Sequence, residues 1–192
     1  REKRQGPMPL ITKVYEYHHP VGVVGFIMPW NYPLALSVSR SHGLGVTLRK
    51  LADWQDQSRE QENDISEHRV ETITHEKGGH SAVGHVQMMC DDPTEEDLQF
   101  AHRFGFLAQL LDDYLDQPDD EADGVSTMFT DGTYTGEMLS KEIDEVEQMA
   151  HRQYDAPTAI NDLFTICRTH KLLADVRNHT RFDPSRLLPW YL

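Results

Sequence analysis

Five aspartates between positions 112 and 120 form the densest group of side chains that could do chemistry, and four of them fall at helical spacings. Asp112, Asp116 and Asp120 are spaced four residues apart, and Asp113 lies three residues before Asp116. Residues three and four apart are neighbours on a helix, so the spacing predicts one acidic helix face. Carboxylates clustered in this way repel one another, and Mg²⁺ would remove that repulsion while completing its shell with phosphate oxygens. The spacing therefore predicts a Mg²⁺ site suited to a diphosphate substrate.

Two other interpretations of these residues stay open. One is a solvated acidic helix end in an acidic protein. The other is a calcium-binding loop, because Asp119, Glu121, Asp123 and Gly124 fill positions 1, 3, 5 and 6 of an EF-hand pattern. Position 12 of that pattern would be Thr130, where the loop needs a bidentate glutamate.

The helix that carries the aspartates is predicted over residues 98–115, with Thr94 as N-cap and Asp97 completing a weaker form of the capping box. Pro118 removes one backbone hydrogen bond, to Tyr114, so the helix either kinks there or ends at Gln117. An end at Gln117 would take Asp120 off the shared face. Further helices are predicted over residues 67–89, 136–151 and 157 to about 176. Near the N-terminus, residues 14–18 and 21–28 are predicted to pair as a hairpin.

A family resemblance follows from the pattern Gln109-Leu110-x-Asp112-Asp113-x-x-Asp116-x-x-x-Asp120-x-x-x-Gly124-x-x-Thr127. It is similar to the second aspartate-rich motif of class I isoprenoid synthases, in the branch of squalene and phytoene synthases. Residues 76–81, Glu-Lys-Gly-Gly-His-Ser, resemble the kinked helix whose small residues pack against the prenyl cavity of that family.

This resemblance covers residues 54–192 and implies a partial isoprenoid-synthase-like bundle. It implies that Asp112, Asp116 and Asp120 bind Mg²⁺ with Asp113 in support, and that Lys77 and Gln109 face an isoprenoid diphosphate. The family uses a second aspartate-rich motif on an opposing helix, and the sequence contains no such partner. Asp53 and Asp56 lack the context of that motif.

A different family is suggested by residues 19–34, which contain Pro29-Trp30-Asn31. This segment resembles the Pro-Trp-Asn motif of aldehyde dehydrogenases, in which the asparagine stabilises the oxyanion of the covalent intermediate. The resemblance stops after residue 39, and the cofactor turn, the glutamate base and the nucleophilic cysteine of that family do not follow. Neither Cys90 nor Cys167 has the context of that nucleophile.

Charge divides the chain near residue 45. Residues 1–50 contain seven Lys and Arg against two Glu, a net +5, whereas the other 142 residues contain 11 against 30, a net −19. The acidic body argues against nucleic-acid binding and fits a salt-adapted, halophilic surface.

The longest apolar runs are too short for a membrane span, and two cysteines without a CxxC pattern predict buried free thiols in a cytoplasmic protein. No histidine is assigned to a metal.

The sequence therefore predicts a mainly α protein with two parts. Residues 1–45 form an aldehyde-dehydrogenase-like hairpin and loop fragment, and residues 46–192 form an acidic, incomplete isoprenoid-synthase-like bundle. The predicted function is a Mg²⁺-dependent prenyl diphosphate-binding protein or transferase, intact or degenerate. The alternatives are a noncatalytic mosaic remnant, a module that binds a partner chain or a second copy to complete its bundle, and a dehydrogenase-related fragment without its cysteine.

Overall fold

The protein is described by a computed structural model that covers residues 3–5, 13–15, 43–63 and 65–180. The chain divides into two compact units, Ser39–Phe182 in one and Arg1–Val38 with Asp183–Leu192 in the other. The larger unit holds every helix within the described ranges. The predicted mainly α class is confirmed, whereas the specific isoprenoid-synthase-like bundle stays a prediction.

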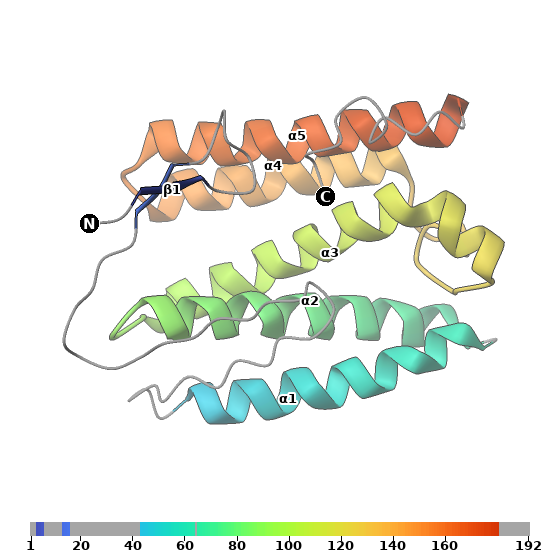
Figure 1. The fold of residues 1–192 in the computed structure, drawn as a ribbon, viewed down its shortest axis with the longest axis horizontal. Coiled ribbons are helices and arrows are strands. Elements are labelled where there is room, and N and C mark those ends of the chain that lie inside the picture. The colour runs from blue at the N-terminus through green and yellow to red at the C-terminus, as the bar shows by residue number, and fades with distance from the viewer. Residues whose placement is uncertain (1–2, 6–12, 16–42, 64, 181–192) are drawn as a thin grey trace. The chain divides into compact units, whose positions relative to one another are not determined.

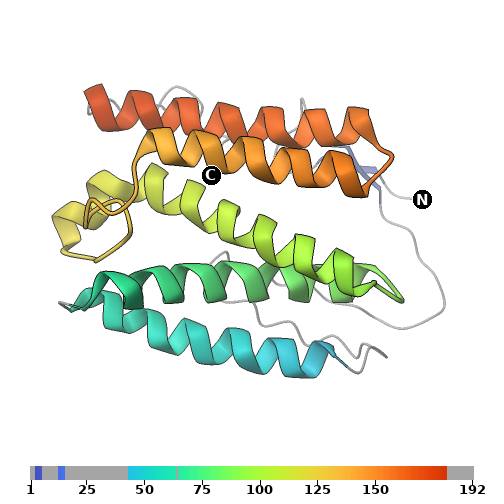
Figure 2. The same cartoon turned by 180° about the vertical axis from the view of Figure 1, so that it is seen from behind.

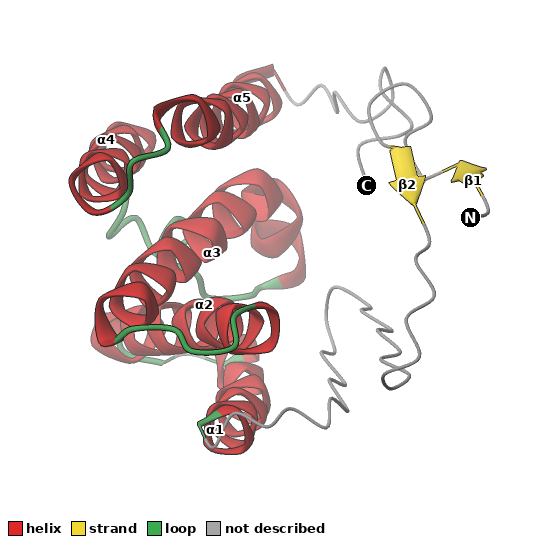
Figure 3. Cartoon of the chain, turned by 90° about the vertical axis from the view of Figure 1, so that its left-hand side faces the viewer, coloured by secondary structure: helices red, strands yellow, loops and turns green. Residues whose placement is uncertain are grey.

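The larger unit contains five α-helices and one short 3₁₀-helix. They are α1 (Leu44–Gln57), η1 (Ser58–Glu62), α2 (Glu67–Met89), α3 (Glu95–Asp123), α4 (Gly136–Gln153) and α5 (Pro157–Thr180). Figures 1 and 2 show α1, α2 and α3 side by side, and α4 and α5 on the other side of α3. The view along the helices in Figure 3 shows the same order, with α3 in the middle. Helix α3 contacts α2, α4 and α5, so it is the central element of the unit.

The α3 helix begins as its sequence predicts. The Asp97 backbone N–H donates to Thr94 Oγ1 over 3.1 Å, and the Thr94 N–H donates to Asp97 Oδ2 over 3.0 Å. This reciprocal capping box confirms Thr94 as the N-cap. Ser66 and Thr135 cap α2 and α4 with their side chains in the same way.

Of the two alternatives at Pro118, an end of the helix at Gln117 is wrong, because α3 continues through Pro118 to Asp123, beyond the predicted range of residues 98–115. Proline cannot donate the backbone hydrogen bond that the carbonyl of Tyr114 would otherwise receive. In the structure that carbonyl accepts from Asn178 Nδ2 over 3.0 Å, and the next one, of Leu115, accepts from Arg177 Nη1 over 2.8 Å. Two side chains of α5 therefore satisfy the carbonyls around the proline.

Glycines bring α2 and α3 into close contact. A Cβ atom built on Gly105 would overlap the carbonyl oxygen of Gly78, and one built on Gly78 would overlap that of Gly105. A Cβ on Gly79 would overlap the His102 ring in the same way. The small residues that were expected to line a prenyl cavity thus pack against α3, because only glycine allows this approach of two backbones.

The core lies where α3 meets α4 and α5. Its fully buried side chains include Leu107 and Leu110 of α3, Leu139 and Val146 of α4, and Phe164 of α5. Other apolar side chains of α3 are partly buried and pack against this core: Phe104, Leu111 and Leu115. The exposed large apolar side chains of α5 are Leu163, Ile166, Leu172 and Val176, and the expected partner chain or second copy stays a prediction.

The smaller unit contains two short paired strands, β1 (Lys3–Gln5) and β2 (Lys13–Tyr15). They are antiparallel, with Lys3 opposite Tyr15. The predicted hairpin of residues 14–18 with 21–28 is not confirmed, because β2 pairs with β1 and residues 16–28 lie outside the described ranges.

The two cysteines differ from one another. Cys167 is buried as predicted, but Cys90 is exposed because it follows Met89 at the end of α2, in the surface turn that leads to α3. Among the described helices, none has the length and apolar composition needed to cross a bilayer.

We expect Gly105→Ala to lower the free energy of unfolding by about 1–3 kcal/mol, because the added methyl group forces the α2 and α3 backbones apart. Gly45→Ala is the matched control, since a Cβ at that position in α1 meets no atom within 4 Å apart from the neighbouring backbone of its own helix. Urea unfolding followed by circular dichroism measures both. Equal stability of Gly105→Ala and the wild type would show that the helices do not depend on this contact.

Candidate functional site

The acidic face of α3 carries the predicted metal ligands. Because α3 is continuous through Pro118, Asp112, Asp116 and Asp120 keep their four-residue spacing on one side of the helix. All three are partly buried. The structure thus brings the three predicted Mg²⁺ ligands onto one surface, as their spacing indicates.

The Asp113 side chain points into the interface between α2 and α3. Its Oδ1 accepts from Gln109 Nε2 over 2.7 Å, and Thr74 Oγ1 lies 3.5 Å from its Oδ2. Burial raises its pKa to about 7, opposed by the Gln109 hydrogen bond and the charge of Lys77. Gln109 Nε2 also lies 3.4 Å from Asp112 Oδ2. Lys77 and Gln109, the two predicted substrate-binding residues, therefore both act on these carboxylates.

Asp120 shows that the acidic residues repel one another. Burial raises its pKa to about 6, and the charges of Asp116 and Asp112 are the next causes. Asp116 differs because Arg177 Nη1 of α5 lies 3.3 Å from its Oδ1. Burial raises the pKa of Asp116 and Arg177 lowers it. On this face Asp116 is paired with a cation, whereas Asp120 lies near other carboxylates.

A calcium loop is excluded at this position. Asp119, Glu121 and Asp123 lie inside α3, and Gly124 is its C-cap with φ 72°. An EF-hand wraps its ligands around the ion in a loop, and helical residues cannot do so. Asp119 forms an ion pair of 2.6 Å with Arg177.

A second group of possible ligands was missed by the sequence argument. Across the described residues, one set of three ligand atoms lies within 4.8 Å of one another, and it belongs to His75, Glu76 and His102. The α3 carboxylates do not form such a set. The histidines were missed because they are far apart in the chain and meet only through the packing of α2 on α3. The adjacent His75-Glu76 pair was the available signal.

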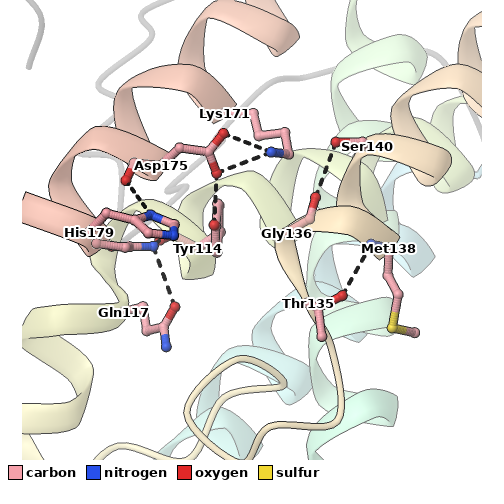
Figure 4. Close-up of polar contacts among 10 residues, drawn as sticks. Tyr114, Gln117, Thr135, Gly136, Met138, Ser140, Lys171, Asp175 and His179 are labelled. Atoms are coloured by element: carbon pink, nitrogen blue, oxygen red, sulfur yellow. Dashed lines mark hydrogen bonds and ion pairs between the residues drawn. The ribbon is translucent and has the colours of Figure 1, made fainter.

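A surface cavity of about 680 Å³ lies where α3, α4 and α5 meet. Its polar side chains are paired, as Figure 4 shows. Tyr114 Oη donates to Asp175 Oδ1 over 2.8 Å, and Lys171 Nζ donates to Asp175 Oδ2 over 2.8 Å. Ser140 Oγ donates to the Gly136 carbonyl over 3.1 Å. The first of these contacts joins α3 to α5, the second lies within α5 and the third lies within α4.

Comparison with known proteins bears on the other end of the chain. Residues 2–42 match the aldehyde dehydrogenase family. A protein of Mycolicibacterium smegmatis (strain ATCC 700084 / mc(2)155) named "Putative succinate-semialdehyde dehydrogenase (NADP(+))" is 60% identical over 37 residues. That match covers 19% of this chain and 7% of the relative. No solved structure matches the chain.

The resemblance of the N-terminal segment to aldehyde dehydrogenases is thereby confirmed. The motif residues Pro29, Trp30 and Asn31 fall within the matched segment but outside the described residues. The match ends before α1 begins at Leu44, so it does not extend to any helix of the described part.

Asp113→Asn should change how stability depends on pH. Because burial raises the pKa of Asp113 to about 7, the folded state favours its protonated form, so stability present below pH 4 is lost as the pH rises to 7. The variant cannot ionise. Its free energy of unfolding should therefore rise relative to the wild type between pH 4 and 7, by up to about 1.4 kcal/mol per pH unit, and level off above.

Urea unfolding at pH 5, 6, 7 and 8 in EDTA measures this difference. Asp162→Asn, at an exposed position of α5, is the control and should give a constant difference. A constant difference for Asp113→Asn as well would show that its carboxyl is not buried in solution.

Proposed function

We propose that the helical unit binds an isoprenoid diphosphate through Mg²⁺ held on the acidic face of α3. The observation that carries this proposal is the continuity of α3 through Pro118, which keeps Asp112, Asp116 and Asp120 on one partly buried face. A helix ending at Gln117 would have separated Asp120 from the other two.

The chemistry of this donor set fits Mg²⁺. The ion prefers oxygen ligands, takes one or two carboxylates from protein and leaves positions for water and phosphate oxygens. Burial and then repulsion by Asp116 and Asp112 raise the pKa of Asp120, and a bound cation would offset this repulsion. When bound, Mg²⁺ would neutralise the charge of a diphosphate.

Neighbouring residues support the carboxylates. Gln109 donates to Asp113 and lies within hydrogen-bond distance of Asp112, so its amide orients both side chains. Lys77 of α2 and Arg177 of α5 supply positive charge near Asp113 and Asp116, respectively. Arginine pairs well with phosphate oxygens, so Arg177 is suited to bind a diphosphate that approaches Asp116.

We propose binding and not ionisation of the substrate. The residues of α2 that act on Asp113 are Thr74 and Lys77, and neither is a carboxylate. Transferase chemistry of the resembled family uses an opposing acidic helix, which the described helices do not present at this position. A degenerate site that retains one acidic motif would hold a diphosphate without activating it.

Farnesyl diphosphate with Mg²⁺ should raise the melting temperature of the full chain, and neither ligand alone should produce the full rise. At about 100 times its Kd, a ligand stabilises the native state by about 2.7 kcal/mol. Asp120→Asn should abolish the rise because it removes a ligand from the face. Scanning calorimetry in high KCl measures the shifts, and inorganic pyrophosphate tests whether the diphosphate group is sufficient.

Asp162→Asn is the matched control because its carboxylate lies on the exposed side of α5. It should shift like the wild type. Equal shifts in wild type and Asp120→Asn, or no shift with any ligand, would contradict the proposal.

A second proposal concerns the N-terminal segment. The match to aldehyde dehydrogenases over residues 2–42 favours a mosaic, in which this segment is joined to an unrelated helical unit. Activity of that family needs a cysteine thiolate as nucleophile. Cys167 is buried, and burial raises its pKa to about 11, so it is not available as a thiolate. Cys90 is exposed but follows α2 and lies outside the matched segment.

The full chain should therefore not reduce NADP⁺ in the presence of succinate semialdehyde. Absorbance of NADPH measures this, and a Cys90→Ser variant should give the same trace as the wild type. Turnover by the wild type that is lost in Cys90→Ser would show that the chain carries its own nucleophile and would overturn this proposal.

A further inference from the structure

Two histidines and a glutamate converge where α2 packs on α3, away from the acidic face. We propose that His75, Glu76 and His102 bind a divalent transition-metal ion, Zn²⁺. Their ligand atoms lie within 4.8 Å of one another. His102 and Asp112, the nearest of the carboxylates proposed to hold Mg²⁺, are ten residues apart on α3, about 15 Å along a helix axis, so the two sites are separate.

The distances are close to those of a loaded site. His75 Nδ1 lies 3.2 Å from Glu76 Oε1, and His102 Nε2 lies 3.9 Å from Glu76 Oε2. A tetrahedral zinc site with bonds of about 2.0–2.1 Å places neighbouring ligand atoms about 3.3 Å apart. Small side-chain rotations would bring the three ligands to that spacing. The imidazole rings of His75 and His102 already lie 4.8 Å apart between centroids.

The glycine contact between the helices makes room for one of the ligands. A Cβ on Gly79 would overlap the His102 ring, so this ring occupies the space that any other residue at position 79 would fill. On the other side, the His75 ring lies 5.0 Å from the ring of Phe106, between centroids. The rings are thus held by packing, which fixes ligand geometry before an ion arrives.

A third histidine orients the glutamate. His80 Nδ1 lies 2.9 Å from the backbone carbonyl of Glu76 and 3.3 Å from its Oε2. His80 is buried, and its ring packs edge-on against His102 with centroids 5.2 Å apart. His80 is therefore a positioning residue: it supports the ligand Glu76 but does not itself have to bind the ion.

The lowered pKa of His102 and the partial exposure of the three side chains agree with a role as metal ligands. Burial lowers the pKa of His102, and the charges of His75, His80 and Lys50 lower it further, while Glu76 raises it. A neutral imidazole keeps a lone pair for a metal. The side chains of His75, Glu76 and His102 are 40%, 30% and 24% exposed, respectively, so an ion can enter from solvent.

The combination of two imidazoles and one carboxylate indicates which metal ion the site prefers. Imidazole suits zinc and related transition ions, whereas Mg²⁺ prefers oxygen ligands. Three protein ligands leave a fourth tetrahedral position for water, which is the arrangement of an open zinc site.

Competition between the untagged, EDTA-stripped full chain and a chromophoric chelator for Zn²⁺ tests the proposal. We expect one Zn²⁺ per chain and a higher melting temperature in its presence. Loss of an outer-shell partner weakens metal sites by about 10–100-fold, so His80→Ala should fall in that range. Glu76→Gln and His102→Ala, which remove direct ligands, should weaken binding by about 100-fold or more.

Three controls keep the result interpretable. His68→Ala removes a histidine of the same helix whose side chain is 90% exposed, and it should bind Zn²⁺ like the wild type. Asp116→Ala should also retain Zn²⁺, so a failure of the Mg²⁺ proposal would leave this one unaffected. His75→Gln replaces a partly exposed ring and tests the site if His102→Ala does not fold.

Co²⁺ gives an independent readout, because an intense visible absorption band reports tetrahedral coordination. The band should appear in the wild type and in His68→Ala and disappear in Glu76→Gln. Zn²⁺ affinity that is unchanged in both Glu76→Gln and His75→Gln, or the absence of Zn²⁺ binding by the folded wild type, would overturn the proposal.

Discussion

The close approach of α2 and α3 is the constraint on which the rest of the helical unit depends. The backbones meet at Gly78 and Gly105, where neither position has room for a Cβ. This contact brings Thr74 to Asp113 on one side and opens the space for His102 beside Gly79 on another. The proposed zinc ligands meet only through this packing, whereas the proposed Mg²⁺ ligands all lie on α3 and depend on it only through the supporting Asp113. A larger residue at either backbone contact would therefore separate His75 and Glu76 from His102 and Thr74 from Asp113.

The second constraint is charge, because the chain has 32 Asp and Glu but only 18 Lys and Arg. Its arginines are used between helices: Arg103 pairs with the buried Glu142 of α4 over 2.7 Å, and Arg168 of α5 pairs with Glu147 of α4 over 2.6 Å. The last turn of α3 has no basic residue, although helix C-termini favour cations. Arg177 of α5 therefore offsets both the helix dipole and the aspartates there. A bound Mg²⁺ would act in the same sense.

Local sequence rules predicted the elements whose ends are set by neighbouring residues. The capping box of Thr94 and Asp97 gave the start of α3, and Pro157 gave the start of α5. The continuation of α3 through Pro118 was not predictable in this way. It depends on Asn178 and Arg177, which are about 60 residues away in sequence and supply donors only after α5 has packed.

The two candidate sites also differ in whether neighbouring residues or the packing of distant segments determines them. The spacing of Asp112, Asp116 and Asp120 on one helix is a local property, so it predicted their shared face. The group of His75, Glu76 and His102 combines two helices, so spacing along one helix does not predict it, and the adjacent His75-Glu76 pair was its one local signal. The exposure of Cys90 was missed although the helix was predicted to end at residue 89, because the prediction of buried thiols did not take account of the surface turn that follows this helix.

The evidence for a function differs between the two parts of the chain: it is sequence similarity for the N-terminal segment and structure for the helical unit. The similarity to aldehyde dehydrogenases is high but covers 37 residues, and catalysis in such an enzyme joins groups that lie far apart in its chain. The matched segment alone therefore carries no activity with it. The helical unit has its own capped helices and its own core, with buried residues from α2 to α5. The contacts that position its carboxylates and histidines come from residues of α2, α3 and α5. A function of this chain is therefore best sought first in the helices.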